Sequence, residues 1–200
     1  MSGISHNLDA LCRLLDIEYI CHTSSEHPDP FVCKWLWILN TKDRFKGYSV
    51  LWIDYDVLWT GIRYTNCERF YRDFIFRDYD LLLTGGWSVG KNEGAKYHSL
   101  VQTGMFCMRP TALDWLERSI KLFIDKTIEN KHNMHDQSAF HDMLFYLPDW
   151  MNVLVDSPPW YIASVVRWNG HMLVHVCGVK DKVATAKEWL RTMTVHNHDV

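Results

Sequence analysis

Hydrophobic and polar positions along the chain follow two periods in turn, one typical of helices and one typical of strands. Apolar residues at helical spacing predict helices over residues 6–15, 31–45, 66–77, 111–129, 135–146 and 182–193. Alternating or continuous apolar runs predict strands over residues 17–22, 48–56, 80–84, 101–109, 152–156 and 171–178. Because helices and strands alternate, we expect an α/β fold with a central, mostly parallel mixed sheet flanked by helices.

The run over residues 48–56 is the most informative segment, because it stays apolar until it ends in Asp54 and Asp56. This pattern predicts a central strand that is buried on both faces and whose C-terminal end reaches a functional site. Uncompensated carboxylates there would be costly to bury, so we expect a cation beside them. Mn²⁺ or Mg²⁺ suits oxygen ligands. The alternative is that one aspartate caps a turn while the other is solvated.

Other polar side chains stand at the ends of predicted elements. His175 lies near the end of the last predicted strand, where it could complete a metal shell, although it also fits a hydrogen-bonded core histidine. Gly178 and Lys180 follow it and suit the close approach and the charge of a phosphate. Asp136 opens a predicted helix, where the helix dipole favours an anion, but simple N-capping explains it as well. The segment 85–94 predicts a glycine-rich loop.

Composition narrows the class of protein. The 200 residues leave room for about one domain, so we expect a single domain over residues 1–200. A net charge of -3, from 21 Lys and Arg against 24 Asp and Glu, argues against a nucleic-acid-binding surface. The 6 cysteines form no C-x-x-C pair, which predicts free thiols in a reducing compartment, the cytoplasm. No apolar run approaches the roughly 18 residues of a membrane span.

Four sequence blocks follow one another in an order that resembles a known family. They are W-I-D-Y-D (52–56), Q-T-G-M-F-C-M-R (102–109), H-D-Q-S-A-F (135–140) and V-H-V-C-G-V-K (174–180). Their order resembles metal-dependent glycosyltransferases of the Rossmann-like GT-A fold. The closest pattern is that of glycosyltransferase family 34, the galactosyl- and mannosyltransferase-like group, over about residues 30–182. In size and in lacking a membrane anchor, the chain is also similar to small virus-encoded capsid glycosyltransferases of the chlorovirus type.

The resemblance implies a metal site, a donor site and a pair of catalytic residues. Asp54, Asp56 and His175 would bind Mn²⁺ or Mg²⁺ and, through the ion, the diphosphate of a nucleotide sugar, UDP-linked in preference to GDP-linked. Asp136 would hold sugar hydroxyls and Gln137 would face the anomeric carbon of a retaining enzyme. The acceptor would be a glycan or a glycoprotein, and the location the cytoplasm, that of a host cell if the chain is viral. The residues assigned to donor binding are Lys34, Tyr55, Thr103, Gly104, Gly178 and Lys180.

The sequence departs from the family pattern at several positions. Gln102 stands where Asn is usual, Tyr55 replaces a small residue, and Val176 and Cys177 replace the commoner Phe and Ala. We expect these changes to alter the fit of the donor. A GT-A domain normally opens with a strand that helps to bind the nucleotide base, whereas this sequence opens with a predicted helix. We therefore expect that strand to be missing from this chain or to be supplied differently.

Two other classes of protein share part of the pattern. The first is a haloacid-dehalogenase-like phosphatase, whose nucleophilic aspartate, here Asp54, would also end a strand in D-x-D. Val57 and Leu58 follow where that class has a Gly-Thr-like continuation. The second is a non-catalytic carbohydrate- or nucleotide-binding module. Its stacking surface would be formed by Trp52, Trp59 and Trp87.

Overall fold

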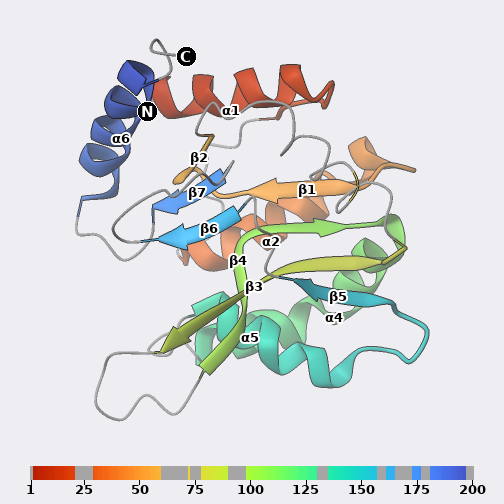
Figure 1. Ribbon diagram of the computed structural model, residues 1–200. Helices are drawn as coiled ribbons and strands as arrows, with labels where there is room; N and C mark the ends of the chain where they lie inside the picture. The colour runs from red at the N-terminus through yellow and green to blue at the C-terminus, as the bar shows by residue number, and fades with distance from the viewer. Residues whose placement is uncertain are drawn as a thin grey trace. The chain divides into compact units, whose positions relative to one another are not determined.

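The computed structural model describes two compact units of this chain. It describes residues 2–20, 29–59, 72, 78–89, 98–129, 135–156, 161–164, 173–176 and 181–196. The first unit comprises residues 1–22, 53–77 and 157–200, and the second comprises residues 23–52 and 78–156. Each unit has its own sheet and its own helices, and we describe them separately (Figure 1).

The second unit is built on a mixed four-stranded sheet. Its strands are β1 (Val50–Ile53), which belongs to this unit up to Trp52, β3 (Leu81–Val89), β4 (His98–Met108) and β5 (Val153–Asp156). Their order is β1-β4-β3-β5, with β3 antiparallel to β4 and parallel to β5. Only residues 90–97 connect β3 to β4, which is shorter than the dozen or more residues that a parallel crossover needs, so the two strands pair antiparallel. The sequence predicted a mixed sheet correctly, but the long β3–β4 pair does not fit its mostly parallel character.

Helices cover this sheet. They are α2 (Pro30–Asn40), the short 3-10 helix η1 (Lys42–Phe45), α4 (Pro110–Glu129), α5 (His135–Met143) and the 3-10 helix η3 (Leu144–Tyr146). α5 packs against β4 and α4, and α2 packs against both α4 and α5 (Figure 1). The single helix predicted over residues 31–45 is therefore α2 followed by η1.

Local chemistry fixes both ends of α2. Asp29 caps its N-terminus by accepting a hydrogen bond from the N–H of Phe31 at 2.8 Å, and Pro30 occupies the first helical turn, where its missing N–H costs nothing. At the other end, the Thr41 hydroxyl donates to the carbonyl of Trp37 at 2.7 Å. This bond satisfies one of the carbonyls that the end of a helix leaves open.

Aromatic rings in stacked and edge-to-face contact form the core of the second unit. The ring centroid of Trp35 lies 4.7 Å from that of Phe106, 4.8 Å from that of Phe123 and 5.0 Å from that of Phe140. Trp52 stacks on Phe106 at 6.3 Å, so its ring packs against the core. This packing weakens the binding-module alternative, which needs Trp52 as a ligand-stacking surface.

The first unit contains a three-stranded sheet and two helices that contact each other. Its elements are α1 (Ser2–Leu14), β2 (Val57–Trp59), β6 (Tyr161–Ser164), β7 (Leu173–Val176) and α6 (Lys182–His196). The strand order is β2-β7-β6, with β7 antiparallel to β2 and parallel to β6. α1 packs against β2 and α6, and α6 packs against β7. The sequence predicted α1, α6 and β7 but neither of the short strands β2 and β6.

The predicted strand over residues 17–22 is wrong in its described part. Asp16 adopts a left-handed backbone conformation with φ of 52°, and the N–H of Ile17 donates to the carbonyl of Cys12 at 2.9 Å. This geometry closes the C-terminus of α1. Residues 17–20 then continue without strand pairing.

Other boundaries also differ from the sequence predictions. β1 is an edge strand of the described sheet and only Val50 in it is buried, whereas a central strand buried on both faces was expected. The predicted glycine-rich loop begins later, because residues 85–89 belong to β3, and its remainder lies outside the described residues. The predicted helix over residues 66–77 lies outside them too, apart from residue 72.

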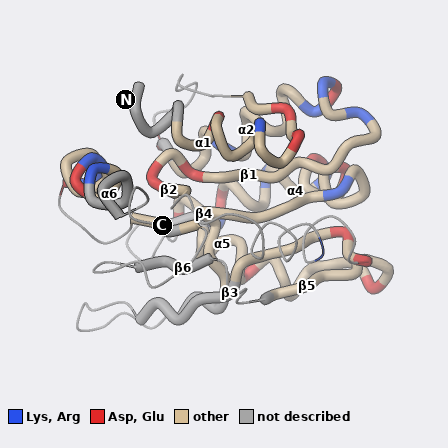
Figure 2. The backbone as a smooth tube through the Cα atoms, turned by 45° about the horizontal axis from the view of Figure 1, so that its top comes forward, with Lys and Arg blue, Asp and Glu red and all other residues tan. Residues whose placement is uncertain are grey.

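The distribution of charge and thiols agrees with the composition. Lys and Arg positions are interspersed with Asp and Glu positions along the described backbone (Figure 2). Cys12, Cys33 and Cys107 are buried free thiols, and the other three cysteines lie outside the described residues. Among the helices that the structure describes, none has both the length and the apolar character needed to cross a bilayer.

Candidate metal centre

A tight turn joins β1 to β2 and carries both carboxylates of the D-x-D sequence. The N–H of Val57 donates to the carbonyl of Asp54 at 3.0 Å and closes the turn. Within the turn, Tyr55 is 59% exposed whereas Asp56 is only 2% exposed. The turn therefore presents an aromatic side chain to solvent while it buries the neighbouring carboxylate.

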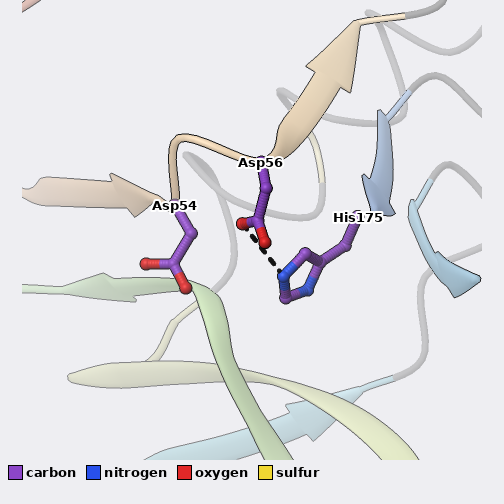
Figure 3. Close-up of side chains that lie close together, drawn as sticks. All are labelled: Asp54, Asp56 and His175. Atoms are coloured by element: carbon purple, nitrogen blue, oxygen red, sulfur yellow. Dashed lines mark ion pairs between the residues drawn. The ribbon is translucent and has the colours of Figure 1, made fainter. Parts of the chain in front are cut away.

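Strand pairing brings His175 to Asp56. In the register of β2 and β7, Val57 lies opposite His175, and the N–H of Val176 donates to the carbonyl of Asp56 at 2.8 Å. Across this pair, Nε2 of His175 lies 3.2 Å from Oδ1 of Asp56, and the two side chains point toward one another (Figure 3). Because Asp56 directly precedes β2 and His175 lies in β7, the pairing of these two strands brings the two side chains together.

A lysine that the sequence analysis did not single out completes the surroundings of Asp56. Lys182 begins α6, and its Nζ lies 2.5 Å from Oδ2 of Asp56. The sequence analysis gave the role of the basic residue to Lys180, which lies outside the described residues together with Gly178. The K-D-K sequence over residues 180–182 held the signal, because it places a second lysine at the start of the closing helix.

These two partners keep the buried carboxylate ionised. Burial raises the pKa of Asp56, but the hydrogen bond and the charge of His175, followed by those of Lys182, outweigh burial and hold the pKa below its ordinary value. Burial lowers the pKa of Lys182, whereas its hydrogen bond to Asp56 and the nearby acidic groups raise it above its ordinary value. Both shifts favour the charged form of the group, so Asp56 and Lys182 form a charged pair at neutral pH.

Asp54, Asp56 and His175 together offer a set of metal ligands. Each provides one ligand atom, and the three atoms lie within 4.8 Å of one another in the first unit. Carboxylate oxygens suit Mg²⁺ and Mn²⁺, and an imidazole nitrogen shifts the preference toward a transition metal. The chemistry of this donor set therefore fits a divalent ion such as Mn²⁺ or Mg²⁺.

Five of the residues predicted for donor binding and catalysis lie in the second unit, whereas Tyr55 lies in the first. Lys34 of α2 is buried, and its Nζ donates to the carbonyl oxygen of Thr103 in β4 at 2.9 Å. Gly104 follows in the same buried strand. Asp136 and Gln137 lie in the first turn of α5, where Gln137 is half-buried and the side chain of Asp136 lies outside the described part.

Comparison with known proteins supports the fold. No protein-family model matches the chain, and no curated protein matches it in sequence. Among solved structures, the chain is similar to a glycosyltransferase involved in the glycosylation of the major capsid of PBCV-1, with a TM-score of 0.69 and 12% sequence identity. The match covers 94% of this chain and 90% of that one. The chain therefore has the fold of a glycosyltransferase, as its resemblance to capsid glycosyltransferases led us to expect.

Proposed function

We propose that this protein is a metal-dependent glycosyltransferase that moves a sugar from a UDP-linked donor to a glycan or glycoprotein acceptor with retention of anomeric configuration. The observation that carries this proposal is the cluster of Asp54 and Asp56, from the turn after β1, with His175 of β7, in a chain with a glycosyltransferase fold. We also propose that residues 1–200 form one catalytic domain of GT-A type. The 94% coverage of the structural match, which includes parts of both units, supports this view.

In the proposed enzyme, Asp54, Asp56 and His175 hold Mn²⁺. When bound, the ion supplies Lewis-acid stabilisation of the departing diphosphate. Before the ion binds, His175 and Lys182 hold both oxygens of Asp56, so this carboxylate is already oriented toward His175. Such preorganisation supports electrostatic catalysis, since the site need not rearrange when charge develops on the leaving group. Tyr55 stands exposed between the two carboxylates, where it can contact the donor.

The remaining roles follow from the family pattern and from residue chemistry. Asp136 holds sugar hydroxyls and Gln137 faces the anomeric carbon. Both residues lie at the N-terminus of α5, where the helix dipole favours negative charge. Lys34 provides a buried positive charge beside the carbonyl of Thr103. Thr103 and Gly104 bind the donor, as the family pattern implies. Gly178 and Lys180 bind the phosphates, and the buried thiols support a cytoplasmic location.

Calorimetric titration of UDP, GDP and their sugar conjugates tests this function. We expect one nucleotide family, UDP, to bind with Mn²⁺ and not with EDTA. Asp56→Asn removes a ligand charge without changing the size of the side chain, so it should abolish metal-dependent binding. Asp43→Asn is a matched control, because Asp43 is an exposed carboxylate of η1 in the other unit, and it should bind like the wild type.

Other outcomes would reject the proposal. Binding of nucleotides or sugars that ignores Mn²⁺ and survives Asp56→Asn would indicate a non-catalytic binding module. Hydrolysis of simple phosphate esters that is lost in Asp54→Asn would indicate a phosphatase with an aspartyl nucleophile. If transfer occurs, NMR of the first-formed product gives the anomeric configuration, and an inverted product would reject retention alone.

A further inference from the structure

Both oxygens of the buried Asp56 carboxylate already have partners within the protein. Oδ1 lies 3.2 Å from Nε2 of His175, and Oδ2 lies 2.5 Å from Nζ of Lys182. Of these three side chains, that of Asp56 is 3% exposed, whereas that of Lys182 is 38% exposed. The negative charge of Asp56 is therefore neutralised at a site that water barely reaches, by a cation that itself reaches solvent.

A divalent ion bound to the Asp56 carboxylate would lie close to the ammonium of Lys182. The ligand atoms of Asp54, Asp56 and His175 lie within 4.8 Å of one another, so an ion held by all three stands close to whatever contacts Asp56. Like charges repel strongly at such separations, because a partly buried site screens them less than water does. The ammonium of Lys182 and the ion therefore repel each other, so they cannot both stay in contact with Asp56.

Lys182 is the group that can move away from Asp56. Its ammonium is carried on a flexible four-carbon stem, and its side chain is already more than one-third exposed at the start of α6. We propose that Lys182 is a tethered counter-ion of Asp56, which neutralises the carboxylate until a divalent metal displaces it. This inference rests on the metal site of the proposed function and adds a residue that sets the affinity of that site.

Displacement also couples metal binding to nucleotide binding. When the ion displaces the Lys182 ammonium, the ion pair between Lys182 and Asp56 is broken. This cost reduces the net free energy of metal binding, so the metal alone should bind weakly. A diphosphate bound with the metal offers the displaced ammonium a new anion, so the metal should bind more tightly in its presence. By thermodynamic linkage, the metal then improves nucleotide binding by the same factor.

Binding of Mn²⁺ alone tests the proposal, with electron paramagnetic resonance of the free ion as the measurement. Lys182→Met removes the charge and keeps the length of the side chain. We expect it to bind Mn²⁺ about tenfold more tightly than the wild type, because the repulsion of a unit charge is removed. Lys182→Arg keeps the charge and should bind like the wild type. Lys187→Met removes an exposed lysine from the same helix and should also leave the affinity unchanged.

The outcomes separate this proposal from the proposed function. If the wild type binds Mn²⁺ and Lys182→Met binds it equally or less tightly, the counter-ion role is wrong while the metal site stands. If neither protein binds Mn²⁺, the metal site itself is wrong. Equal tightening in Lys187→Met would also overturn the proposal, because the effect would then be one of net charge.

If Lys182→Met is unstable, the effect of Mn²⁺ on the melting temperature still tests the proposal. Removing Lys182 leaves the buried Asp56 carboxylate with less compensation, so the variant should melt at a lower temperature than the wild type in EDTA. Mn²⁺ should then raise its melting temperature more than that of the wild type, because the ion replaces the missing charge. An equal or smaller rise would overturn the proposal.

Discussion

Nε2 of His175 lies 3.2 Å from Oδ1 of Asp56, across the antiparallel pair of β2 and β7. This contact joins two residues that stand 119 positions apart in the chain, and it places an imidazole beside a carboxylate that is almost wholly buried. The pair can act as two ligands of one ion, and without the ion the contact between them holds the carboxylate in place. Changes at either residue should therefore affect both stability and metal affinity.

His175→Ala should lower both quantities. The substitution removes one proposed metal ligand and takes a hydrogen-bond partner from the buried Asp56. We expect a loss of about 1–3 kcal/mol in the free energy of unfolding, measured by urea denaturation in EDTA. The affinity for Mn²⁺, measured by calorimetry, should fall by at least about 10–100-fold, the loss typical of mutating a residue that only supports a metal ligand.

His141→Ala is the matched control for this prediction. His141 is a half-buried histidine of α5, in the second unit, with a ring contact to Phe145. Its removal should leave the affinity for Mn²⁺ unchanged. Equal losses in both variants would contradict the assignment of His175 to the metal site.

Acid should destabilise the protein through Asp56. Its pKa in the folded state lies below the ordinary value of 3.8. The folded state therefore binds fewer protons than the unfolded state as the pH approaches that value, so the contribution of Asp56 to stability is complete at higher pH and is lost as the pH falls through its folded-state pKa. Urea denaturation in EDTA between pH 3 and pH 7 measures this dependence, and Asp56→Asn should flatten it.

A second carboxylate provides the comparison. Glu188 pairs with Arg191 on the surface of α6, and this hydrogen bond and charge lower the pKa of Glu188. Because exposed ion pairs contribute little to stability, Glu188→Gln should leave the acid dependence close to that of the wild type. If Glu188→Gln flattened the curve as much as Asp56→Asn, burial of Asp56 would not be the cause.

Lys34→Met should affect both stability and donor binding. The methionine side chain is similar in length but cannot donate to the buried carbonyl of Thr103, so it should lower the free energy of unfolding by about 1–3 kcal/mol. If Lys34 binds the donor as proposed, the loss of its charge should weaken nucleotide-sugar binding by about 1.5–3 kcal/mol, measured by calorimetry with Mn²⁺. Lys126→Met, at an exposed ion pair with Glu129 on α4, should weaken neither. Unchanged nucleotide-sugar binding in Lys34→Met would restrict Lys34 to its contact with Thr103.

Alkaline pH should destabilise the protein through its buried thiols. Burial raises the pKa of Cys107 to about 11 and, helped by Asp9, that of Cys12 to about 11, from an ordinary value of 9.0. Between these values the unfolded state loses its protons first, so stability is full below pH 9 and falls as the pH rises toward 11. Urea denaturation over this range should show a smaller fall in Cys107→Ala than in the wild type. Rapid alkylation of the folded wild type at Cys107 near neutral pH would contradict this account.

The helices in the described part of the chain were predicted well because their signals are local. Pro110 and the helical spacing of the apolar residues after it place α4 within one residue of its predicted start, and the predicted and observed ends coincide at Glu129. The short strands were missed for the opposite reason. β2 and β6 have three and four residues and carry too little pattern, and only their pairing with β7 defines them as strands.

The sequence by itself determined the ligand chemistry of the candidate site. An apolar run that ends in Asp54 and Asp56, with His175 in a later apolar segment, already predicts oxygen and nitrogen ligands for a divalent ion. Their spatial proximity was expected only from the family resemblance and from the rule that sites form at strand ends.

Only the tertiary structure decided which carboxylate is buried and which side chain neutralises it. Asp56 meets Lys182 because β2 pairs with β7 and α6 begins soon after β7, a relationship between residues 126 positions apart. Hydrogen bonds and charges act over a few ångströms in space, whereas the pattern of apolar and polar positions reports only neighbours along the chain. The identity of Asp56's counter-ion was therefore a property of the fold.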